Sequence, residues 1–383
     1  MNRPIRTLHV DIEGGRGGSS RSLYQLISRL DRSRVEPIVA YRETGPLEDW
    51  YKDLGIRIVH VPEIGSYVPR TKNSAKIFAA SLPRLLGTNQ AARRLLEIAE
   101  ENDVEILHLN YEGLFLLAAR LRQLTSRPMI CHVRAHLPIN AWSRWLVRKL
   151  SRAVDHYFFI SPQEEERVRQ LEAGRLLPGQ VLWNIAPQYR KRVPFDEVKE
   201  AVYLGNIDWS KGTDRLIDVA AALKKLSVDG LKIAIYGEPR RARPAYFNQM
   251  NARVQSEGLS GLIEFRGFTS EPETVLSKAF ALIRPSRERD PWGRDVIEAT
   301  SFGVPVLATG DYGGVVDSGV TGFLVDPFDA STMAAKLKVL LEDETLWKRM
   351  SAAAISRGET IFSGQQQVAQ FTSVLEKLRS EDV

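Results

Sequence analysis

Residues 281–308 read ALIRPSRERDPWGRDVIEATSFGVPVLA, and this stretch decides the fold. It opens with a short apolar run at 281–283, passes through a charged loop, and becomes amphipathic over 295–302. A second apolar run, 305–308, follows at once. Strand, loop, helix and strand in this order form a βαβ unit, whose two strands lie parallel in one sheet. The stretch therefore predicts a parallel sheet covered by helices.

The same alternation of short apolar runs and longer amphipathic segments extends through the rest of the chain. In the first half, strands are predicted at 7–10, 37–41, 56–61, 105–109, 129–133 and 156–160, and helices at 20–30, 90–101, 113–124 and 142–150. In the second half, further strands are predicted at 202–204, 232–236, 263–265 and 322–325, and further helices at 214–226, 245–257, 330–341 and 365–378. The fold class is therefore α/β, with two successive parallel sheets.

The alternation breaks once, over the polar segment 184–194, which contains Pro187 and Pro194 and is the best candidate for a linker. We predict an N-terminal Rossmann-like domain over 1–190, a C-terminal one over 191–362, and a last helix over 363–383 that crosses back to the first domain. In open parallel sheets, ligands bind at the carboxyl ends of the strands. The active site is therefore expected in a cleft between the two domains.

Composition bounds the class of protein. The chain has 383 residues, of which 43% are hydrophobic and 26% charged, which fits a folded globular protein of two domains. No stretch approaches the roughly 20 apolar residues of a membrane span, and the N-terminus lacks the apolar core of a signal peptide. The single cysteine, Cys131, favours a reducing cytoplasm and is expected in the core beside a strand. The sequence pI of about 9.3 alone does not indicate nucleic-acid binding, because no recognition motif accompanies it.

The loop and helix of residues 284–298 carry groups that suit a nucleotide. A helix that begins near Asp295 points its free N–H groups toward the loop, which favours an anion there. Asp290 precedes this helix, and Glu298 follows eight residues later. Carboxylates accept hydrogen bonds from ribose or sugar hydroxyls, so the stretch predicts a site for a sugar and a diphosphate.

A glycine-rich loop follows the first predicted strand. It contains Gly14, Gly15, Gly17 and Gly18, and then a helix begins. It matches neither a Walker loop nor the dinucleotide pattern G-x-G-x-x-G. A tight turn is one interpretation, but we favour a loop that faces a phosphate or sugar, with Gly17 and Gly18 in contact with the donor.

Two histidines, His132 and His136, stand at the end of a predicted strand. A metal pair is not favoured, because no third ligand is obvious. For each histidine, a structural role and a role in the cleft remain open.

The sequence resembles the retaining glycosyltransferases of family GT4, which have the GT-B architecture and take sugars from nucleotide diphosphate donors. The family pattern PS-x-x-E-x-F-G-x-x-x-x-E-A appears here as Pro285-Ser286, Asp290, Trp292-Gly293 and Glu298-Ala299. The family segments G-x-P-V-V-A, G-G-x-x-E and G-x-L-V-x-P appear here over residues 303–308, 313–317 and 322–327.

The resemblance implies a role for each matching residue. It places Glu298 on the donor ribose, Asp290 and His132 beside the transferred sugar, and the backbone at Val296 and Ile297 against the diphosphate. It assigns Lys211 to the diphosphate in both donor binding and catalysis. The family's G-R-L is Gly205-Asn206-Ile207 here, so an arginine is replaced by Asn206. We predict that Arg284, Arg287, Arg289 or Arg294 supplies the missing charge.

The resemblance also implies the reaction. Transfer retains the anomeric configuration, proceeds without a metal or other cofactor, and uses a nucleotide sugar, most simply one carrying UDP or GDP, as co-substrate.

Two acid-free basic runs in the first half predict a face for an acceptor or an anionic membrane. The residues assigned to this face are Arg70, Lys72, Lys76, Arg134, Trp142, Trp145 and Arg148. We therefore predict a cytoplasmic hexosyltransferase, peripheral at the inner face of the membrane, that builds a lipid-linked or cell-surface glycan such as a polysaccharide or lipopolysaccharide. A sugar-nucleotide epimerase and a non-catalytic scaffold subunit of this architecture remain as alternatives, and a nicotinamide oxidoreductase is a weaker one.

Overall fold

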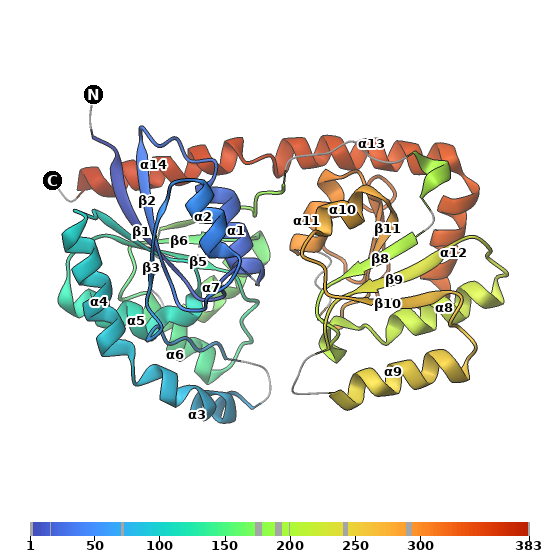
Figure 1. Ribbon diagram of the computed structural model, residues 1–383, viewed down its shortest axis with the longest axis horizontal. Coiled ribbons are helices and arrows are strands. Elements are labelled where there is room, and N and C mark those ends of the chain that lie inside the picture. Colours follow the sequence, from blue (N-terminus) through green and yellow to red (C-terminus); the bar gives the residue numbers. More distant parts are fainter. Residues whose placement is uncertain are drawn as a thin grey trace. The chain divides into compact units, whose positions relative to one another are not determined.

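The computed structural model of the chain describes residues 3–15, 17–69, 73–172, 178–187, 194–198, 200–239, 244–288 and 293–381. The chain divides into two compact units. The first comprises Met1–Ile185 together with Gly364–Val383, and the second comprises Ala186–Ser363. Each unit is built on its own parallel sheet (Figure 1).

The N-terminal unit contains a seven-stranded sheet in the order β3-β2-β1-β4-β5-β6-β7. Its strands are β1 (Ile5–Asp11), β2 (Val35–Tyr41), β3 (Arg57–His60), β4 (Ile106–Leu109), β5 (Met129–Val133), β6 (His156–Phe159) and β7 (Gly179–Val181). Its helices are α1 (Gly18–Ile27), α2 (Leu47–Asp53), α3 (Ser74–Leu85), α4 (Thr88–Glu101), α5 (Phe115–Leu124), α6 (Ala141–Leu150), α7 (Pro162–Leu171) and α14 (Gln365–Glu381). All the strand pairs are parallel, as predicted.

The two faces of this sheet bury different sets of side chains, because successive residues of a strand point to opposite faces. One face packs against helices α4, α5, α6 and α7 and includes Leu8 and Cys131. The other face, which includes Ile106, packs against α1, α2 and α14, and Phe371 of α14 is buried there. The C-terminal helix thus belongs to the core of the N-terminal unit.

The C-terminal unit contains a six-stranded parallel sheet in the order β10-β9-β8-β11-β12-β13. Its strands are β8 (Glu200–Leu204), β9 (Lys232–Tyr236), β10 (Ile263–Gly267), β11 (Ala279–Arg284), β12 (Val306–Ala308) and β13 (Gly322–Leu324). Its helices are α8 (Arg215–Lys225), α9 (Pro244–Ser256), α10 (Pro272–Ser277), α11 (Arg294–Ser301), α12 (Ala330–Glu342) and α13 (Glu344–Ile361). Short 3₁₀ turns complete the two units at Glu112–Leu114, Phe195–Glu197 and Trp209–Lys211.

The stretch that decided the fold from sequence forms β11, α11 and β12 in that order. Every residue of β11 is buried, which explains why the strand is a continuous apolar run rather than an alternating one. The predicted fold class, two parallel-sheet Rossmann-like units, is confirmed. Cys131 lies fully buried in the core, where burial raises the pKa of its thiol, and so it matches the structural role predicted for it. Among the helices that the structure describes, none is long and apolar enough to cross a membrane.

Candidate active site

The order of strands in the C-terminal unit defines a binding edge. Strand order runs from β8 outward to β10 on one side and from β11 outward to β13 on the other. The loops after β8 and β11 therefore diverge over opposite faces of the sheet. Ligands of open parallel sheets bind at such a reversal, at the carboxyl ends of the two central strands. The residues between β8 and α8 and those between β11 and α11 are thus brought to one place.

The two loops approach each other closely. Gly212 has a φ of +69°, and a Cβ atom on it would lie 2.0 Å from the carbonyl oxygen of Pro285. Only glycine fits there, since it tolerates this φ and leaves room for the carbonyl. The amide of Arg287 donates to the carbonyl of Ser210 at 2.9 Å, and the Arg215 guanidinium donates to the carbonyl of Pro285 at 3.1 Å. The backbone of one loop is therefore fixed to that of the other.

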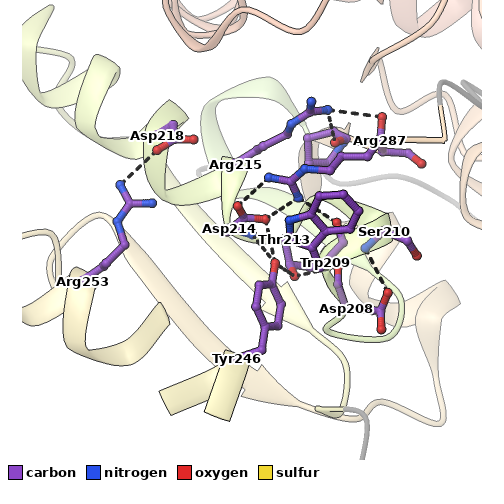
Figure 2. Close-up of polar contacts among 12 residues, drawn as sticks. Asp208, Trp209, Ser210, Thr213, Asp214, Arg215, Asp218, Tyr246, Arg253 and Arg287 are labelled. Carbon is purple, nitrogen blue, oxygen red and sulfur yellow. Dashed lines mark hydrogen bonds and ion pairs between the residues drawn. The ribbon is translucent and has the colours of Figure 1, made fainter. Parts of the chain in front are cut away.

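A charged cluster around Asp214 reinforces this junction (Figure 2). The two terminal nitrogens of the Arg287 guanidinium donate to the Asp214 carboxylate, at 2.7 and 2.6 Å. Arg287 also donates to the carbonyl of Trp209 at 2.7 Å and lies 4.5 Å from the centre of its indole ring. The Tyr246 hydroxyl donates to Asp214 at 2.7 Å. Burial by itself would raise the pKa of Asp214, but the hydrogen bonds from Arg287 and Tyr246 outweigh burial and lower it.

Lys211 lies on the β8 loop, as predicted, and is paired with an acid that the sequence did not point to. Its Nζ atom lies 2.6 Å from Oε2 of Glu288, on the β11 loop. The side chains are 30% and 51% exposed respectively, so both can be reached by a ligand. An ammonium group at this position can neutralise a phosphate as a point charge.

Helix α11 begins after Gly293, and its own carboxylates are engaged by arginines. Asp295, in the first turn, accepts two hydrogen bonds of 2.8 Å from Arg284 at the end of β11. Glu298 is 5% exposed and pairs with Arg294 one turn earlier on the same helix.

The remaining predicted donor residues fall into two groups. The side chains of Val296 and Ile297 are fully buried in the protein, so only their backbone can face a ligand. Gly205 and Asn206 are exposed at the end of β8. The carbonyl oxygen of Asn206 accepts a hydrogen bond of 2.9 Å from the Tyr203 hydroxyl, which fixes the start of the loop.

The predicted substitute for the missing arginine can be compared with these contacts. Arg284, Arg287 and Arg294 each bind a carboxylate of the same unit, namely Asp295, Asp214 and Glu298. Any of them that also binds a diphosphate has to share its guanidinium with that carboxylate. Arg289 and Asp290 lie outside the residues that the structure describes.

In the N-terminal unit, the order of strands reverses between β1 and β4, and a polar cluster lies there. Asn110 donates to Asp11 at 3.0 Å, and Ser20 donates to the other oxygen of the same carboxylate. The Arg134 guanidinium donates to the side chain of Asn110 at 2.6 Å and to that of Asn184 at 2.9 Å. Arg134 is thus a part of this cluster, and its assignment to an acceptor or membrane face stays a prediction.

The glycine-rich loop after β1 is shaped by contacts within the unit. Glu13 accepts hydrogen bonds from the amide and hydroxyl of Ser19, at the start of α1. A Cβ atom on Gly17 would lie 1.9 Å from this carboxylate. Gly14 has a φ of +61° and packs against the carbonyl of Glu43. The Glu13 carboxylate thus occupies the place of an anion at the amide of Ser19, and contact of Gly17 and Gly18 with a donor stays a prediction.

His132 and His136 differ in their surroundings. His132 is 3% exposed and lines a cavity of about 10 Å³, room for roughly one water molecule. Arg134, Asn184 and Gln367 lie around the same cavity. His136 is about half exposed, and its two ring nitrogens contact Glu164 and Arg167. Among the described residues, no cluster of three or more histidine, cysteine or carboxylate side chains is placed to hold a metal.

The basic and aromatic face predicted for the first half is only partly exposed. Trp142 and Trp145 are half-buried and pack edge-on with each other, and both contact Phe78 of α3. Their rings therefore join α3 to α6, and their contact with an acceptor or membrane stays a prediction. Lys76 on α3 and Arg148 on α6 are exposed. Arg70 and Lys72 lie outside the described residues.

A larger groove in the same unit lies away from these residues. It has a volume of about 500 Å³ and is lined by polar side chains of α4 and of the segment after β3, including Glu63, Gln90, Arg94 and Glu97. Those side chains pair with each other, Gln90 with Glu63 and Arg94 with Glu97. The groove does not lie at a point where the order of strands reverses, so we assign it no function.

Comparison with known proteins gives one family for each half of the chain. Residues 186–357 match the family model "Glycosyl transferases group 1", and residues 17–177 match "Glycosyl transferase 4-like domain". The chain is 28% identical over 251 residues to alpha-D-kanosaminyltransferase of Streptomyces kanamyceticus. The aligned region covers 61% of this chain and 62% of that protein. It is 32% identical over 98 residues to the capsular polysaccharide biosynthesis glycosyltransferase CapM of Staphylococcus aureus, over 25% of this chain and 26% of that one. The chain thus spans less than two thirds of these relatives.

The fold has solved counterparts. Anabaena Alr3699/HepE, crystallised in complex with UDP, superposes with a TM-score of 0.78 at 17% identity and covers 97% of this chain and all (100%) of that one. This likeness concerns the fold, that of GT-B glycosyltransferases.

Proposed function

The chain belongs to the GT4-like group 1 glycosyltransferases, and on this premise we propose that it transfers a sugar from a nucleotide diphosphate donor to a glycan. The observation that carries the proposal is the junction of the β8 and β11 loops. This junction joins Lys211 to the β11 loop, which leads into α11, and the N-terminus of a helix favours an anion. Glu298, a carboxylate suited to ribose hydroxyls, lies on the same helix.

The donor is proposed to be a UDP- or GDP-linked sugar. A UDP complex of the similarly folded HepE supports a uridine nucleotide as the first candidate. In this proposal Lys211 neutralises the diphosphate, the exposed backbone at Gly205 and Asn206 borders it, and Glu298 accepts hydrogen bonds from the ribose.

Transfer is proposed to retain the anomeric configuration and to need no metal. The leaving diphosphate accepts the proton of the acceptor hydroxyl, and the new glycosidic bond forms on the face that the diphosphate leaves. Lys211 stabilises the negative charge that develops on the diphosphate during this step. His132 and Arg134, from the N-terminal unit, are proposed to bind the transferred sugar and the acceptor.

The acceptor is proposed to be a lipid-linked or cell-surface glycan at the inner face of the membrane. Helix α3 supports this, because it exposes Leu82 by 44% and is followed by Leu86, which is 81% exposed. Lys76 and Arg84 lie exposed on the same helix. An apolar edge with cations beside it suits an anionic lipid surface. The printed name of CapM, a capsular polysaccharide glycosyltransferase, agrees with this class of acceptor.

Product analysis tests the reaction. The protein is incubated with UDP- and GDP-sugars, with and without a lipid-linked acceptor extract, and the products are resolved by mass spectrometry and NMR. We expect a glycosylated product whose anomeric configuration matches that of the donor. The product should form only when the acceptor is present, and it should still form in the presence of EDTA. Epimerisation of the donor in the absence of acceptor would mean that the protein is an epimerase and not a transferase. If no donor is converted at all, the result would favour a scaffold subunit.

Vesicle sedimentation tests the membrane contact separately. We expect binding to vesicles containing phosphatidylglycerol and weaker binding by Leu86→Glu. The matched control is Val339→Glu, since Val339 is a 44% exposed apolar residue of the C-terminal unit. Equal binding by both variants would remove α3 as the contact.

A further inference from the structure

Three histidines form a row on one face of the N-terminal sheet. His9 on β1, His108 on β4 and His132 on β5 lie on the face that α14 covers, and the ring of Phe371 contacts all three. His9 and His108 are directly opposite each other in the register of the two strands. The rings are buried, and burial lowers the pKa of His9 to about 3 and those of His108 and His132 well below their usual value. All three are therefore neutral at pH 7.

Hydrogen bonds join the row into a chain that begins at a threonine. The Thr7 hydroxyl lies 2.8 Å from Nε2 of His9, and Nδ1 of His9 lies 2.7 Å from Nδ1 of His108. Nε2 of His108 lies 2.7 Å from Nδ1 of His132. The chain uses both ring nitrogens of His9 and His108 but only Nδ1 of His132. Nε2 of His132 is left at its end, in the residue that lines the small cavity beside Arg134.

A neutral imidazole carries one N–H group, so the chain can run in only two directions. If Thr7 donates to His9, then His9 donates from Nδ1, His108 donates from Nε2, and His132 carries its proton on Nε2. In the opposite direction, His132 carries its proton on Nδ1 and Thr7 only accepts. The direction of the chain thus decides whether the free nitrogen of His132 is a donor or an acceptor.

The threonine decides between the two. Thr7 is 0% exposed, and among the described residues its hydroxyl has no hydrogen-bond partner besides His9. Were it to accept from His9, its own proton would be buried without a partner, which is unfavourable. Donation by Thr7 leaves no such proton. The cost of leaving a buried donor unsatisfied favours the donating direction by about fivefold or more over the other.

We infer that Thr7, His9 and His108 lock His132 in the tautomer with its proton on Nε2, so that His132 is a hydrogen-bond donor to an oxygen atom of the bound sugar and not a general base. This inference rests on the proposed function for its ligand, while the lock itself does not. The chain ends at Thr7, which is 0% exposed, so it positions a proton rather than conducting protons.

The groups around His132 agree with a neutral donor. The titratable or charged groups around it are His9 on β1, His108 on β4, His156 on β6 and Arg134, which directly follows β5. From α14 it meets Phe371, and Ser22 of α1 and Gln367 of α14 line the same cavity. Arg134 disfavours a proton-accepting role, because its charge opposes formation of an imidazolium beside it. Its charge instead attracts the electron-rich oxygen that a donor at Nε2 would bind.

Nitrogen NMR of histidine rings tests the lock on the intact protein. The chain has only 6 histidines, so [¹⁵N]histidine labelling gives a resolvable long-range ¹H–¹⁵N spectrum, in which protonated and bare ring nitrogens are well separated. At pH 7 we expect His132 and His108 to be protonated on Nε2 and His9 on Nδ1. Protonation of His132 on Nδ1, or on both nitrogens, would overturn the inference.

Two matched variants test the role of Thr7. Thr7→Ser keeps the hydroxyl and should keep the wild-type tautomers, whereas Thr7→Val removes it and should populate the Nδ1–H tautomer of His132 to tens of per cent. An unchanged His132 spectrum in Thr7→Val would overturn the lock. The value of kcat/KM for the donor sugar should fall with the lost Nε2–H population, about twofold. If no donor is turned over, the proposed function fails, and the NMR result still decides the lock.

Discussion

Nζ of Lys211 lies 2.6 Å from Oε2 of Glu288, so the cation on the loop after β8 is paired with an acid on the loop after β11. A diphosphate that binds Lys211 has to compete with this carboxylate. Exposed ion pairs contribute about 1 kcal/mol or less. We therefore expect Glu288→Gln to lower the Kd for a nucleoside diphosphate by up to about fivefold.

Lys211→Ala should act in the opposite direction, raising that Kd about 10- to 100-fold, because hydrogen bonds to charged groups contribute about 1.5–3 kcal/mol. Isothermal titration calorimetry measures both. Glu344→Gln is the control, since Glu344 pairs with Lys348 at 2.7 Å elsewhere in the same unit. Weaker binding by Glu288→Gln would show that Glu288 assists the donor instead of competing with it.

The contact of Asp214 with Arg287 is expected to stabilise the junction of the two loops. Asp214→Asn replaces a carboxylate that accepts two hydrogen bonds from this guanidinium, and we expect a loss of about 1.5–3 kcal/mol in the free energy of unfolding. Tyr246→Phe, which keeps the ion pair, should lose only about 1 kcal/mol.

The effect of Asp214→Asn should also depend on pH. The pKa of Asp214 in the folded chain is below its ordinary value of 3.8. Its charge therefore stabilises the fold fully above that value and progressively less as the pH falls through the lowered pKa. Urea unfolding of the variant and wild type at pH 7 and pH 3 measures this. A difference between the two proteins that is no smaller at pH 3 would contradict the assignment.

The buried histidines predict how stability depends on pH. In the unfolded chain, His9, His108, His132 and His156 bind protons below about pH 6.5, whereas burial lowers their pKa values and keeps them neutral in the fold. Glu112 opposes this trend, because burial raises its pKa from 4.5 to about 7 and the fold binds its proton first. Four protons less one leaves three, each about 1.4 kcal/mol per pH unit.

The free energy of unfolding should therefore fall by about 4 kcal/mol for each pH unit below 6.5. Denaturant unfolding between pH 7 and pH 5 measures the slope, and Glu112→Gln, which removes the opposing proton, should steepen it by about 1.4 kcal/mol per unit. Stability that is constant over this range would mean that the histidines are protonated in the fold.

Much of the fold follows from the sequence, because strands buried on both faces are continuous apolar runs. Helix α13 was not predicted, although it has 18 residues. Its buried face includes Ser351, Ala354 and Gly358 beside Trp347 and Met350, so small and polar residues interrupt the apolar stripe. Helix α3 was missed as well, and it contains Pro83. Whether such segments form helices is decided by tertiary packing and not by the local sequence pattern.

Lys211 and Glu298 were predicted from the family resemblance, on the loop after β8 and on the helix that follows the β11 loop. Glu288, Arg287 and Asp214 were not recognised as a group, because the pairs they form join residues more than 70 positions apart. Such pairs depend on β8 lying next to β11, and strand order cannot be read from a local pattern.

The histidine row illustrates the same limit. Alternation along each strand puts His9, His108 and His132 on inward positions, which a period-two analysis of each strand could have found. That they touch follows only from the order β1-β4-β5.

The central claim, a nucleotide site formed by the β8 loop and α11, is tested most directly by titrating UDP and GDP into wild type and Glu298→Gln. The control is Glu257→Gln, because Glu257, directly after α9, also pairs with an arginine four residues earlier, Arg253 at 2.9 Å. We predict that one nucleotide binds wild type and Glu257→Gln equally and binds Glu298→Gln at least tenfold more weakly. Equal binding to all three proteins, or binding of neither nucleotide to folded wild type, would contradict the account.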